Sequence, residues 1–521
     1  MPAQILRRSY ALCLSLLVTF GSATAQESAD DEFVLQHSAY LSMHYVQPAI
    51  RWAPCAAAPS QECGTLAVPI DYRRPHSGTL DMALVRVKAS DAARRLGTLV
   101  IAYGGPSRVS AVDATLALLT QPNYVRLRER FDLVSFDARG TGRSRPVQCD
   151  LSPVGRPPET ASAETLARFF DDFGRLVAET CFKQNGPFLT QVSTNNVARD
   201  MDVLRRSLGE RQLSFYGPSY SSMVGAVYAS IFPRHVRAMV LDGVRAPETR
   251  DYVMETMSET MAGSELALHR VDQLCRASSS CLLRTAGVIA TMDQVLARLR
   301  ASPFTFPDGR VLDAARFQSL IDSALADENR WPDVVQGLTA AGAGRFQVFE
   351  GFLPPLGSVA VAGLGSSVLQ ASRFEAFTAV SCLDYGSRRS TASSLPFDEA
   401  FASLHRRLVQ RFDVSAMVGM CSAWPAVDAP TITRIKGRVA QPVLLIANHF
   451  DSRTSLSWAR SMARTLGMES SLVRYEGGGH SAYFPRPGPR VTCIDDVVES
   501  YLFELRVPPE GFACAARPVV F

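Results

Sequence analysis

The sequence has little of several features that would place it in a functional class. Its formal net charge is only +4 over 521 residues, and lysine is so scarce that arginine carries almost all of the positive charge. These arginines form no stripe along the chain, which argues against nucleic acid as a partner. No group of cysteines and histidines has zinc-ligand spacing, so we expect no metal and no other cofactor. The composition, with 47% apolar and 20% charged residues, is typical of a soluble globular enzyme.

The N-terminus has the pattern of a targeting signal. Arg7 and Arg8 precede an apolar segment at residues 10–20, which is too short to cross a bilayer. Residues 23–25 then form a cleavage site of the A-x-A type. We therefore predict that residues 1–25 are a signal peptide. The mature chain is expected to be secreted or periplasmic, with no membrane span.

If the chain is exported, its cysteines are expected to form disulfides. The chain has 11 cysteines, and removal of the signal peptide with Cys13 leaves an even number. Neighbours in sequence indicate five local disulfides in an oxidising compartment, with free buried thiols as the alternative. The predicted pairs are Cys55 with Cys63, Cys149 with Cys181, Cys275 with Cys281, Cys382 with Cys421, and Cys493 with Cys514.

Strand and helix patterns alternate in the first and last parts of the chain. The run at residues 97–103 is apolar almost throughout, as a strand buried on both faces must be. Between residues 245 and 440 the alternation stops, and helical patterns with glycine and proline breaks take over. We predict an α/β fold with a mostly parallel central sheet. Its core would comprise residues 26–244 and 441–521, and residues 245–440 would be a mainly helical cap inserted between two strands.

A serine lies where one predicted strand gives way to a helix. Residues 217–221 read Gly-Pro-Ser-Tyr-Ser, close to the Gly-x-Ser-x-Gly pattern of a nucleophile elbow, with Ser221 in place of the second glycine. The Oγ of Ser219 would lie at the helix N-terminus, where free N–H groups favour an oxyanion. An ordinary strand-to-helix turn is the alternative.

A second glycine-containing loop follows the buried strand at residues 97–103. Its residues 104–107 read Gly-Gly-Pro-Ser. In α/β-hydrolases the loop at this place supplies the second N–H of the oxyanion hole. We therefore predict that the N–H groups of Tyr220 and Gly105 form the hole, with a simple turn as the alternative.

An aspartate and a histidine follow two late strands. Asp451 comes after the apolar strand at residues 442–447, and His480 comes after the last strand and three glycines, which would give it an unobstructed approach. The order Ser, Asp, His is that of α/β-hydrolases. Imidazole takes the serine proton, and the carboxylate orients the ring. We predict Ser219 as nucleophile, His480 as base and Asp451 as acid.

Three other residues compete with these assignments. His449, two residues before Asp451, is the rival base. Asp242, at the end of an earlier strand, is the rival acid, because some hydrolases place the acid there. His235 follows a helix and is interpreted as a surface or capping residue.

Several motifs resemble the secreted tripeptidyl aminopeptidase and proline iminopeptidase branch of the α/β-hydrolases. They are Tyr103-Gly104-Gly105-Pro106, the Asp-Ala-Arg-Gly-Thr-Gly-Arg-Ser motif at residues 137–144, Gly217-Pro218-Ser219-Tyr220, Leu241-Asp242-Gly243-Val244, and the tail with Asp451, Thr454, His480, Cys493 and Cys514. The resemblance implies a serine exopeptidase that acts on peptide N-termini under a helical cap. It also implies the same roles for Ser219, Asp451 and His480. Ser107 and Ser221 depart from the glycines usual in that branch.

These observations favour an aminopeptidase, expected as a monomer with peptide substrates. A carboxylesterase with the same triad is the first alternative, and a non-catalytic binding protein on this fold is the second. An enzyme that binds a free N-terminus must offer the ammonium a carboxylate. Asp384 is the candidate, because the predicted Cys382 bridge would hold it in place, and a surface aspartate is the alternative.

Overall fold

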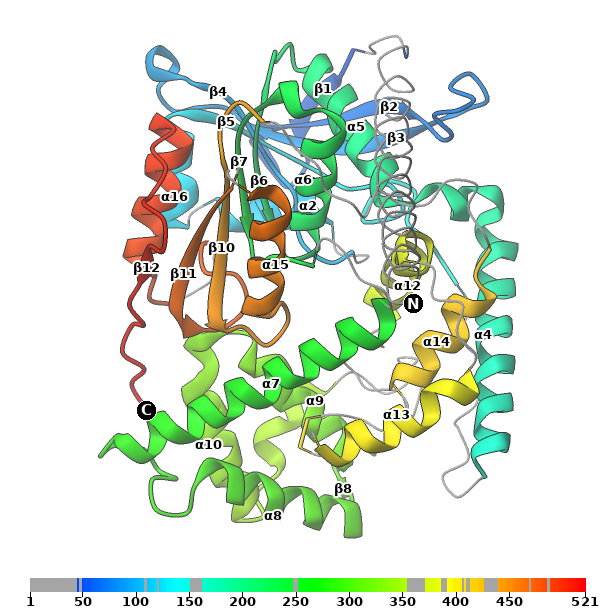
Figure 1. The fold of residues 1–521 in the computed structure, drawn as a ribbon, viewed down its shortest axis with the longest axis vertical. Helices are drawn as coiled ribbons and strands as arrows, with labels where there is room; N and C mark the ends of the chain where they lie inside the picture. Colours follow the sequence, from blue (N-terminus) through cyan, green and yellow to red (C-terminus); the bar gives the residue numbers. More distant parts are fainter. Residues whose placement is uncertain are drawn as a thin grey trace, which may run out of the picture.

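The computed structural model describes residues 45, 49–106, 110–119, 121–149, 162–246, 252–353, 371–385, 391–404, 407–408, 413–425, 439–467, 470–484 and 488–521. The predicted signal peptide lies outside these residues. The described chain forms one large sheet covered by helices, with a block of helices below it (Figure 1).

The large sheet has ten strands, and most of them run parallel. The strands are β1 (Arg51–Cys55), β2 (Ala58–Pro69), β3 (Thr79–Val87), β4 (Gly97–Ile101), β5 (Phe131–Phe136), β6 (Leu213–Pro218), β7 (Val236–Asp242), β10 (Val443–Phe450), β11 (Ser470–Gly478) and β12 (Ala513–Cys514). Their spatial order is β1-β2-β3-β5-β4-β6-β7-β10-β11-β12. Neighbours are antiparallel from β1 to β5 and parallel from β5 onward. The predicted α/β-hydrolase fold is confirmed.

Helices cover both faces of this sheet. One face carries α2 (Ala111–Leu118), α3 (Pro122–Arg128) and α16 (Thr492–Glu504), and the other carries α5 (Thr194–Ser207), α6 (Tyr220–Ile231) and α15 (Leu456–Leu466). Every residue of the central strands β4 and β6 is buried as a result. This two-sided burial explains why their sequences are apolar runs without alternation.

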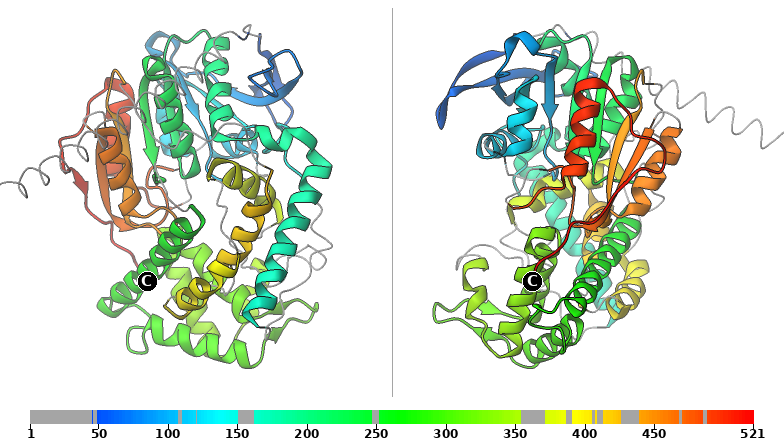
Figure 2. Two further views of the ribbon diagram at one scale, coloured as in Figure 1. Left: turned by 45° about the vertical axis from the view of Figure 1, so that its right-hand side comes forward. Right: turned by 90° about the vertical axis from the view of Figure 1, so that its left-hand side faces the viewer.

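The chain leaves the sheet after β7 and returns in β10, which pairs directly with β7. Between them lie α7 (Tyr252–Ala277), α8 (Val288–Ala301), α9 (Ala314–Leu325), α10 (Trp331–Gly342), α12 (Ala371–Tyr385), α13 (Thr391–Leu404) and α14 (Asp413–Ala423), with the small hairpin of β8 (Phe304–Thr305) and β9 (Val311–Leu312). These elements form the block of helices on one side of the sheet (Figures 1 and 2).

One helix from outside that insertion joins it. Helix α4 (Ala163–Asn185) precedes β6 in the chain, yet it runs alongside α14 (Figure 2). The two backbones meet at glycines, because a methyl group on Gly174 would lie 2.1 Å from the carbonyl oxygen of Gly419. We call α7 to α10 the first cap half, and α12 to α14 together with α4 the second cap half.

The two cap halves are packed differently. The first half has its own apolar cluster, which includes Val271, Leu296, Trp331 and Phe349. The buried side chains of the second half belong to the same cluster as α5, α6 and α15 of the core. The second half is therefore continuous with the core in packing, whereas the first half has a centre of its own.

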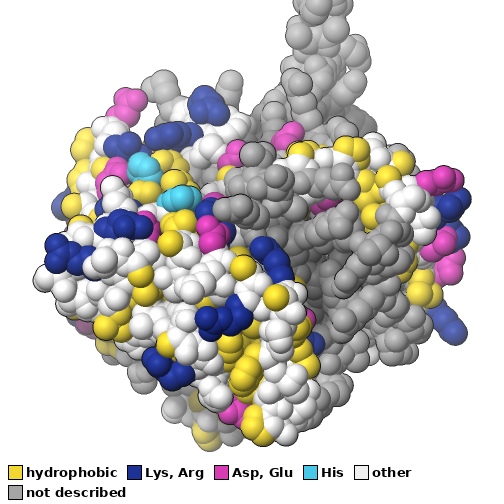
Figure 3. Space-filling view, turned by 90° about the horizontal axis from the view of Figure 1, so that it is seen from below, with side chains coloured by type: hydrophobic (Ala, Val, Ile, Leu, Met, Phe, Trp, Pro, Cys, Tyr) yellow, Lys and Arg dark blue, Asp and Glu magenta, His cyan; other side chains and the backbone are white. Residues whose placement is uncertain are grey.

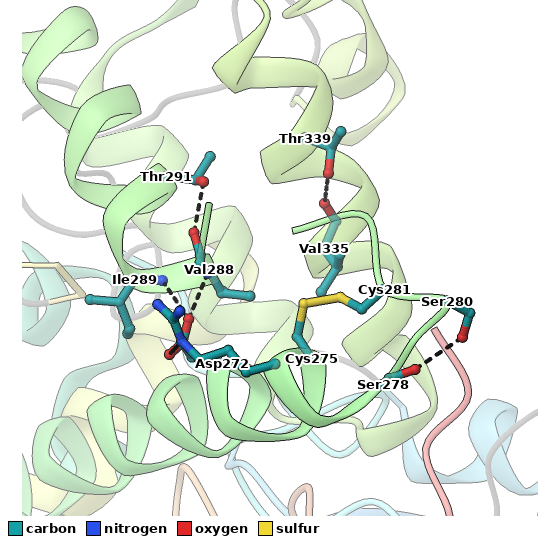
Figure 4. Close-up of a disulfide and its surroundings, with 12 residues drawn as sticks. Asp272, Cys275, Ser278, Ser280, Cys281, Val288, Ile289, Thr291, Val335 and Thr339 are labelled. Carbon is teal, nitrogen blue, oxygen red and sulfur yellow. Dashed lines mark hydrogen bonds and ion pairs between the residues drawn. A yellow bond between two sulfur atoms is a disulfide. The ribbon is translucent and has the colours of Figure 1, made fainter. Parts of the chain in front are cut away.

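All five predicted disulfide pairs are present. They are Cys55–Cys63, Cys149–Cys181, Cys275–Cys281, Cys382–Cys421 and Cys493–Cys514. Cys382–Cys421 joins α12 to α14. Cys275–Cys281 closes the end of α7, close to Asp272, whose carboxylate accepts the N–H groups of Val288 and Ile289 at the start of α8 (Figure 4).

Charged side chains are mixed on the surface. Among the described side chains on the face in Figure 3, basic and acidic ones are interspersed. In the part of the chain that the structure describes, no helix is both long enough and apolar enough to span a membrane.

Candidate active site

Ser219 lies between β6 and α6 in a strained backbone conformation. Its φ of 57° and ψ of −128° are unfavourable for a residue with a side chain. The surrounding backbone holds this conformation, because the N–H of Ser219 donates to the carbonyl oxygen of Asp242 at 2.8 Å and its own carbonyl oxygen accepts the N–H of Ser222 at 2.9 Å. A strained serine at a strand-to-helix turn is the geometry of a nucleophile elbow.

The loop after β4 lies directly against this serine. A methyl group on Gly104 would come within 2.7 Å of the Ser219 Cβ and 3.3 Å of its Oγ, so only glycine fits there. Gly105 follows with a φ of 124°. Ser221 donates its hydroxyl to the carbonyl oxygen of Tyr103 at 2.5 Å. The serine that replaces the usual glycine therefore connects α6 to this loop, while Ser107 lies outside the described residues.

Asp451 and His480 meet at the ends of β10 and β11. The Nδ1 of His480 is 3.0 Å from each carboxylate oxygen of Asp451. Asp451 also accepts the N–H groups of Arg453 and Thr454 and the Thr454 hydroxyl, at 2.7, 2.8 and 2.9 Å. Burial alone would raise the pKa of Asp451, but the His480 ring and these donors outweigh it and hold the pKa below its usual value.

The last residue of β7, Asp242, and the next residue, Gly243, connect the serine to the histidine loop. The carbonyl oxygen of Asp242 accepts the Ser219 N–H, and it also accepts the Ser481 hydroxyl at 3.2 Å. A methyl group on Gly243, which has a φ of 65°, would lie 3.1 Å from the Cε1 of His480. The elbow, the aspartate and the histidine thus come together at the carboxyl edge of the parallel strands, where open α/β sheets place their sites.

The rival residues have other partners. His449 is exposed, and its Nδ1 lies 3.0 Å from a Glu476 oxygen. His235 pairs through Nδ1 with Asp202 at 2.8 Å. The carboxylate of Asp242 accepts backbone N–H groups beyond His480, as described below, whereas Asp451 contacts the ring.

Asp384 is buried close to the residue that follows the nucleophile. The residue is 5% exposed, so the surface-aspartate alternative is wrong. One carboxylate oxygen accepts the N–H of Thr194 at 2.9 Å, and the other accepts the Thr194 hydroxyl. That hydroxyl also bonds to the hydroxyl of Tyr220. Asp384 therefore caps the start of α5 and is linked to Tyr220, and its contact with a substrate amine stays a prediction.

Sequence reasoning missed the contribution of the cap to this site. Glu328, between α9 and α10, accepts a hydrogen bond from Gly478, 150 residues further along the chain. No periodicity or spacing pattern connects residues so far apart.

Among the described residues, no group of three or more His, Cys, Asp or Glu side chains has the arrangement of a metal site.

Comparisons with known proteins agree with the geometry. Residues 408–514 match the family described as TAP-like protein. The chain is 28% identical to serine protease Hip1 of Mycobacterium tuberculosis over 496 residues, covering 89% of this chain and 91% of that protein. It is 27% identical to tripeptidyl aminopeptidase of Streptomyces lividans over 481 residues, covering 89% and 86%. Carboxylesterase B of Mycobacterium tuberculosis is 28% identical over 466 residues, covering 87% and 86%.

The resemblance to the tripeptidyl aminopeptidase-like α/β-hydrolases is thereby confirmed. The fold and these relatives together identify the protein as a serine hydrolase. A non-catalytic role on this fold, the second alternative from the sequence, does not fit that finding.

Proposed function

We propose that this serine hydrolase is an exported aminopeptidase that releases short fragments or single residues from peptide N-termini through an acyl-enzyme on Ser219. The observation that carries the proposal is the Asp451–His480 pair beside the strained elbow serine. The similarity of the chain to a tripeptidyl aminopeptidase and to a serine protease supports a peptide as substrate.

The first half of the reaction forms the acyl-enzyme. His480 takes the Ser219 proton on Nε2 while Nδ1 stays bonded to Asp451, and the serine Oγ attacks the scissile carbonyl carbon. The oxyanion that forms would accept the N–H groups of Tyr220 and Gly105. When the tetrahedral intermediate collapses, the C–N bond breaks, and His480 gives its proton to the leaving amine.

The second half of the reaction repeats these steps with water. His480 takes a proton from the water as its oxygen attacks the acyl carbon, and then returns a proton to the Ser219 oxygen as the ester bond breaks. Because the pKa of Asp451 is held below its usual value, its carboxylate stays ionised throughout and stabilises the imidazolium formed in each half.

An aminopeptidase must also recognise the free amine. We propose Asp384 for this role, because it is a buried carboxylate of the second cap half and a buried ammonium needs a carboxylate partner. Its link through Thr194 to Tyr220 puts a negative charge in the neighbourhood of the nucleophile. If Asp384 binds the substrate ammonium, the separation between Asp384 and Ser219 would set how many residues lie between the peptide N-terminus and the cleaved bond.

The test compares tripeptide anilides with free and acetylated N-termini. The wild type should cleave the free form faster, and Asp384→Asn should lose most of that selectivity, about 100-fold for one member of a buried charge pair. Asp398→Asn is the matched control, since Asp398 is also buried in the second cap half but caps α14 through Val414 and Ser415. Equal cleavage of both peptides by the wild type would reject amine recognition.

A carboxylesterase is the second candidate, supported by the similarity to carboxylesterase B. The same serine and histidine would cleave an ester, and no amine would be read. Fast hydrolysis of short acyl esters together with no cleavage of any peptide would favour this candidate over the aminopeptidase.

Export is part of the proposal and has its own test. Five disulfides favour an oxidising compartment. Mass spectrometry of the mature protein from a secreting host should find Gln26 at the N-terminus. A mature chain that retains residues 1–25 would contradict cleavage there.

A further inference from the structure

The loop that carries His480 is bonded to the first cap half as well as to the sheet. Glu328 lies in the short turn between α9 and α10. Its carboxylate accepts the N–H of Gly478 at 2.9 Å and the hydroxyl of Tyr475 at 2.7 Å. The N–H of His480 itself donates to the carbonyl oxygen of Ala326 at 2.8 Å. Two backbone groups of the histidine loop are therefore held by residues 326–328 of the cap.

Close packing accompanies these hydrogen bonds. A methyl group on Gly478 would lie 2.2 Å from the ring of Trp331, and one on Gly479 would lie 2.9 Å from the backbone nitrogen of Glu328. The sequence interpretation of these glycines as an unobstructed approach for His480 is therefore wrong. They are the positions at which the cap turn touches the loop, and any side chain there would push the two apart.

The carboxylate of Glu328 is buried but well supplied with donors. Its residue is 6% exposed, and the Nε of Arg517 lies 2.9 Å from one oxygen. Burial raises the pKa of Glu328, and its hydrogen bonds to Tyr475 and Gly478 and its ion pair with Arg517 offset the rise only in part. A small pocket that is open to solvent adjoins Glu328, Gly478 and Arg517. Hydrogen bonds and close packing therefore act together on this side of the loop.

A carboxylate of the sheet holds the other side of the same loop. Asp242 accepts the N–H groups of Ala482 and Tyr483, each at 2.9 Å, and the hydroxyl of Tyr216 at 2.9 Å. His480 thus lies between two buried carboxylates, each of which binds backbone N–H and one tyrosine hydroxyl. One of them comes from the core and the other from the cap.

We propose that Glu328 is a positioning residue for His480, which makes the first cap half a structural part of the catalytic centre. The proposal rests on the proposed triad. By holding Gly478, Glu328 fixes the path of the chain two residues before the imidazole. The ring can then face Ser219 while Nδ1 keeps both contacts with Asp451. A displacement of about 1 Å in such a group is enough to slow catalysis on the order of 100-fold.

The test measures kcat and KM of Glu328→Ala and Glu328→Gln on a p-nitrophenyl ester and on a free-amine tripeptide anilide. The alanine variant should lose about 100-fold in kcat on both substrates, with KM changed less than about threefold. The glutamine variant should recover at least about tenfold of that loss, because its amide oxygen still accepts the Gly478 N–H.

Asp327→Asn is the matched control. Asp327 lies in the same turn, and its carboxylate accepts the N–H of Asn329. The kcat of the Asp327→Asn variant should equal the wild-type value within about twofold, since the contacts from Glu328 and Ala326 to the histidine loop are kept. A similar loss in this control would show that any disturbance of the turn slows the enzyme, and would overturn a specific role for Glu328.

Thermal unfolding and circular dichroism separate positioning from folding. If kcat per folded molecule is unchanged in both Glu328 variants, Glu328 is only structural and the proposal is wrong. A rise in KM at constant kcat would also overturn it. His480 would act on both the ester and the peptide. If the wild type cleaves esters but no peptide, the aminopeptidase proposal fails, and the ester measurements still test the role of Glu328.

Discussion

The first and second cap halves contact different parts of the candidate site. The first half binds the loops after β10 and β11. Arg453 forms an ion pair with Asp322 of α9 at 2.7 Å, and Glu328 holds the histidine loop. The second half reaches the nucleophile side instead, through Asp384 of α12 and its bond to Thr194.

This difference separates two tasks that a cap can perform. The first half touches the residues that orient the imidazole, so changes there should act mainly on kcat. The second half is bonded to the start of α5 and through it to Tyr220, the residue after Ser219, and it carries the buried Asp384 that we assign to the substrate amine. Changes there should therefore act mainly on selectivity. The predictions below test this division, beginning with the largest expected effect and ending with the smallest.

Removal of a proposed triad residue should lower kcat more than any change in either cap half. Ser219→Ala and His480→Ala should each lower kcat by on the order of a million-fold, and the double variant should be little worse, because the two residues act as a unit. Asp451→Ala should cost less. Single-turnover kinetics with an ester substrate would measure all four, and wild-type turnover by Ser219→Ala would refute the elbow assignment.

Loss of the ion pair between the first half and the acid loop should destabilise the fold by an amount between those expected for the two disulfides below. Arg453→Met leaves Asp322 buried without its partner, and about 3 kcal/mol of stability should be lost, at the low end for such a pair because the Arg453 side chain is 25% exposed. Urea unfolding would measure it. Adding Asp322→Asn should restore part of the loss, and an additive double variant would show that the pair is not coupled.

The disulfides of the two halves offer a matched pair. Cys382–Cys421 spans 39 residues and Cys275–Cys281 spans 6. Loop entropy predicts a loss of about 4 kcal/mol when the first is replaced by serines and about 2 kcal/mol for the second. Thermal melts of the two double-serine variants give the comparison. A larger loss from the short bridge would mean that native contacts, not chain entropy, dominate.

The smallest expected effect is on the pH dependence of stability, to which Asp451 and Glu328 should contribute in opposite directions. The lowered pKa of Asp451 makes its contribution to stability complete above about pH 4 and lost as the pH falls through the folded value. Burial raises the pKa of Glu328, so its contribution is complete below about pH 4 and lost as the pH rises through the folded value.

Substitution by the neutral isostere should remove each of these slopes separately. Asp451→Asn should flatten the melting temperature below about pH 4, and Glu328→Gln should flatten it above that value. Melting curves between pH 3 and 8 would record both. Parallel curves for Glu328→Gln and the wild type would contradict the raised pKa.

The sequence carries the local part of this site. Ser219, Asp451 and His480 each follow a strand within a few residues, so the strand pattern and the chain order were enough to predict them. The motif at residues 137–144 was visible in the sequence as part of a family resemblance, and in the structure its Asp137 accepts the N–H groups of Val112 and Arg143. The disulfide pairs were also predictable because each joins neighbours in sequence.

Contacts between distant segments could not be predicted in this way. A helical pattern shows that α4 has an apolar face, but the pattern does not say that α14 will cover it. The glycines before His480 were interpreted as freedom of approach, since nothing local indicates that Trp331 packs on Gly478. Asp242 was considered as a rival acid, and only the folded chain shows that its carboxylate binds backbone N–H groups.

The pairing of β7 with β10 also has a consequence for how activity appears during folding. About 200 residues of cap separate these strands, so a long loop must close before they can pair, and such distant contacts form slowly. Ser219 lies before that loop, whereas Asp451 and His480 lie after it. A partly folded or unfinished chain would therefore present the proposed nucleophile without its proposed base, and hydrolysis would begin only when the last strands have joined the sheet.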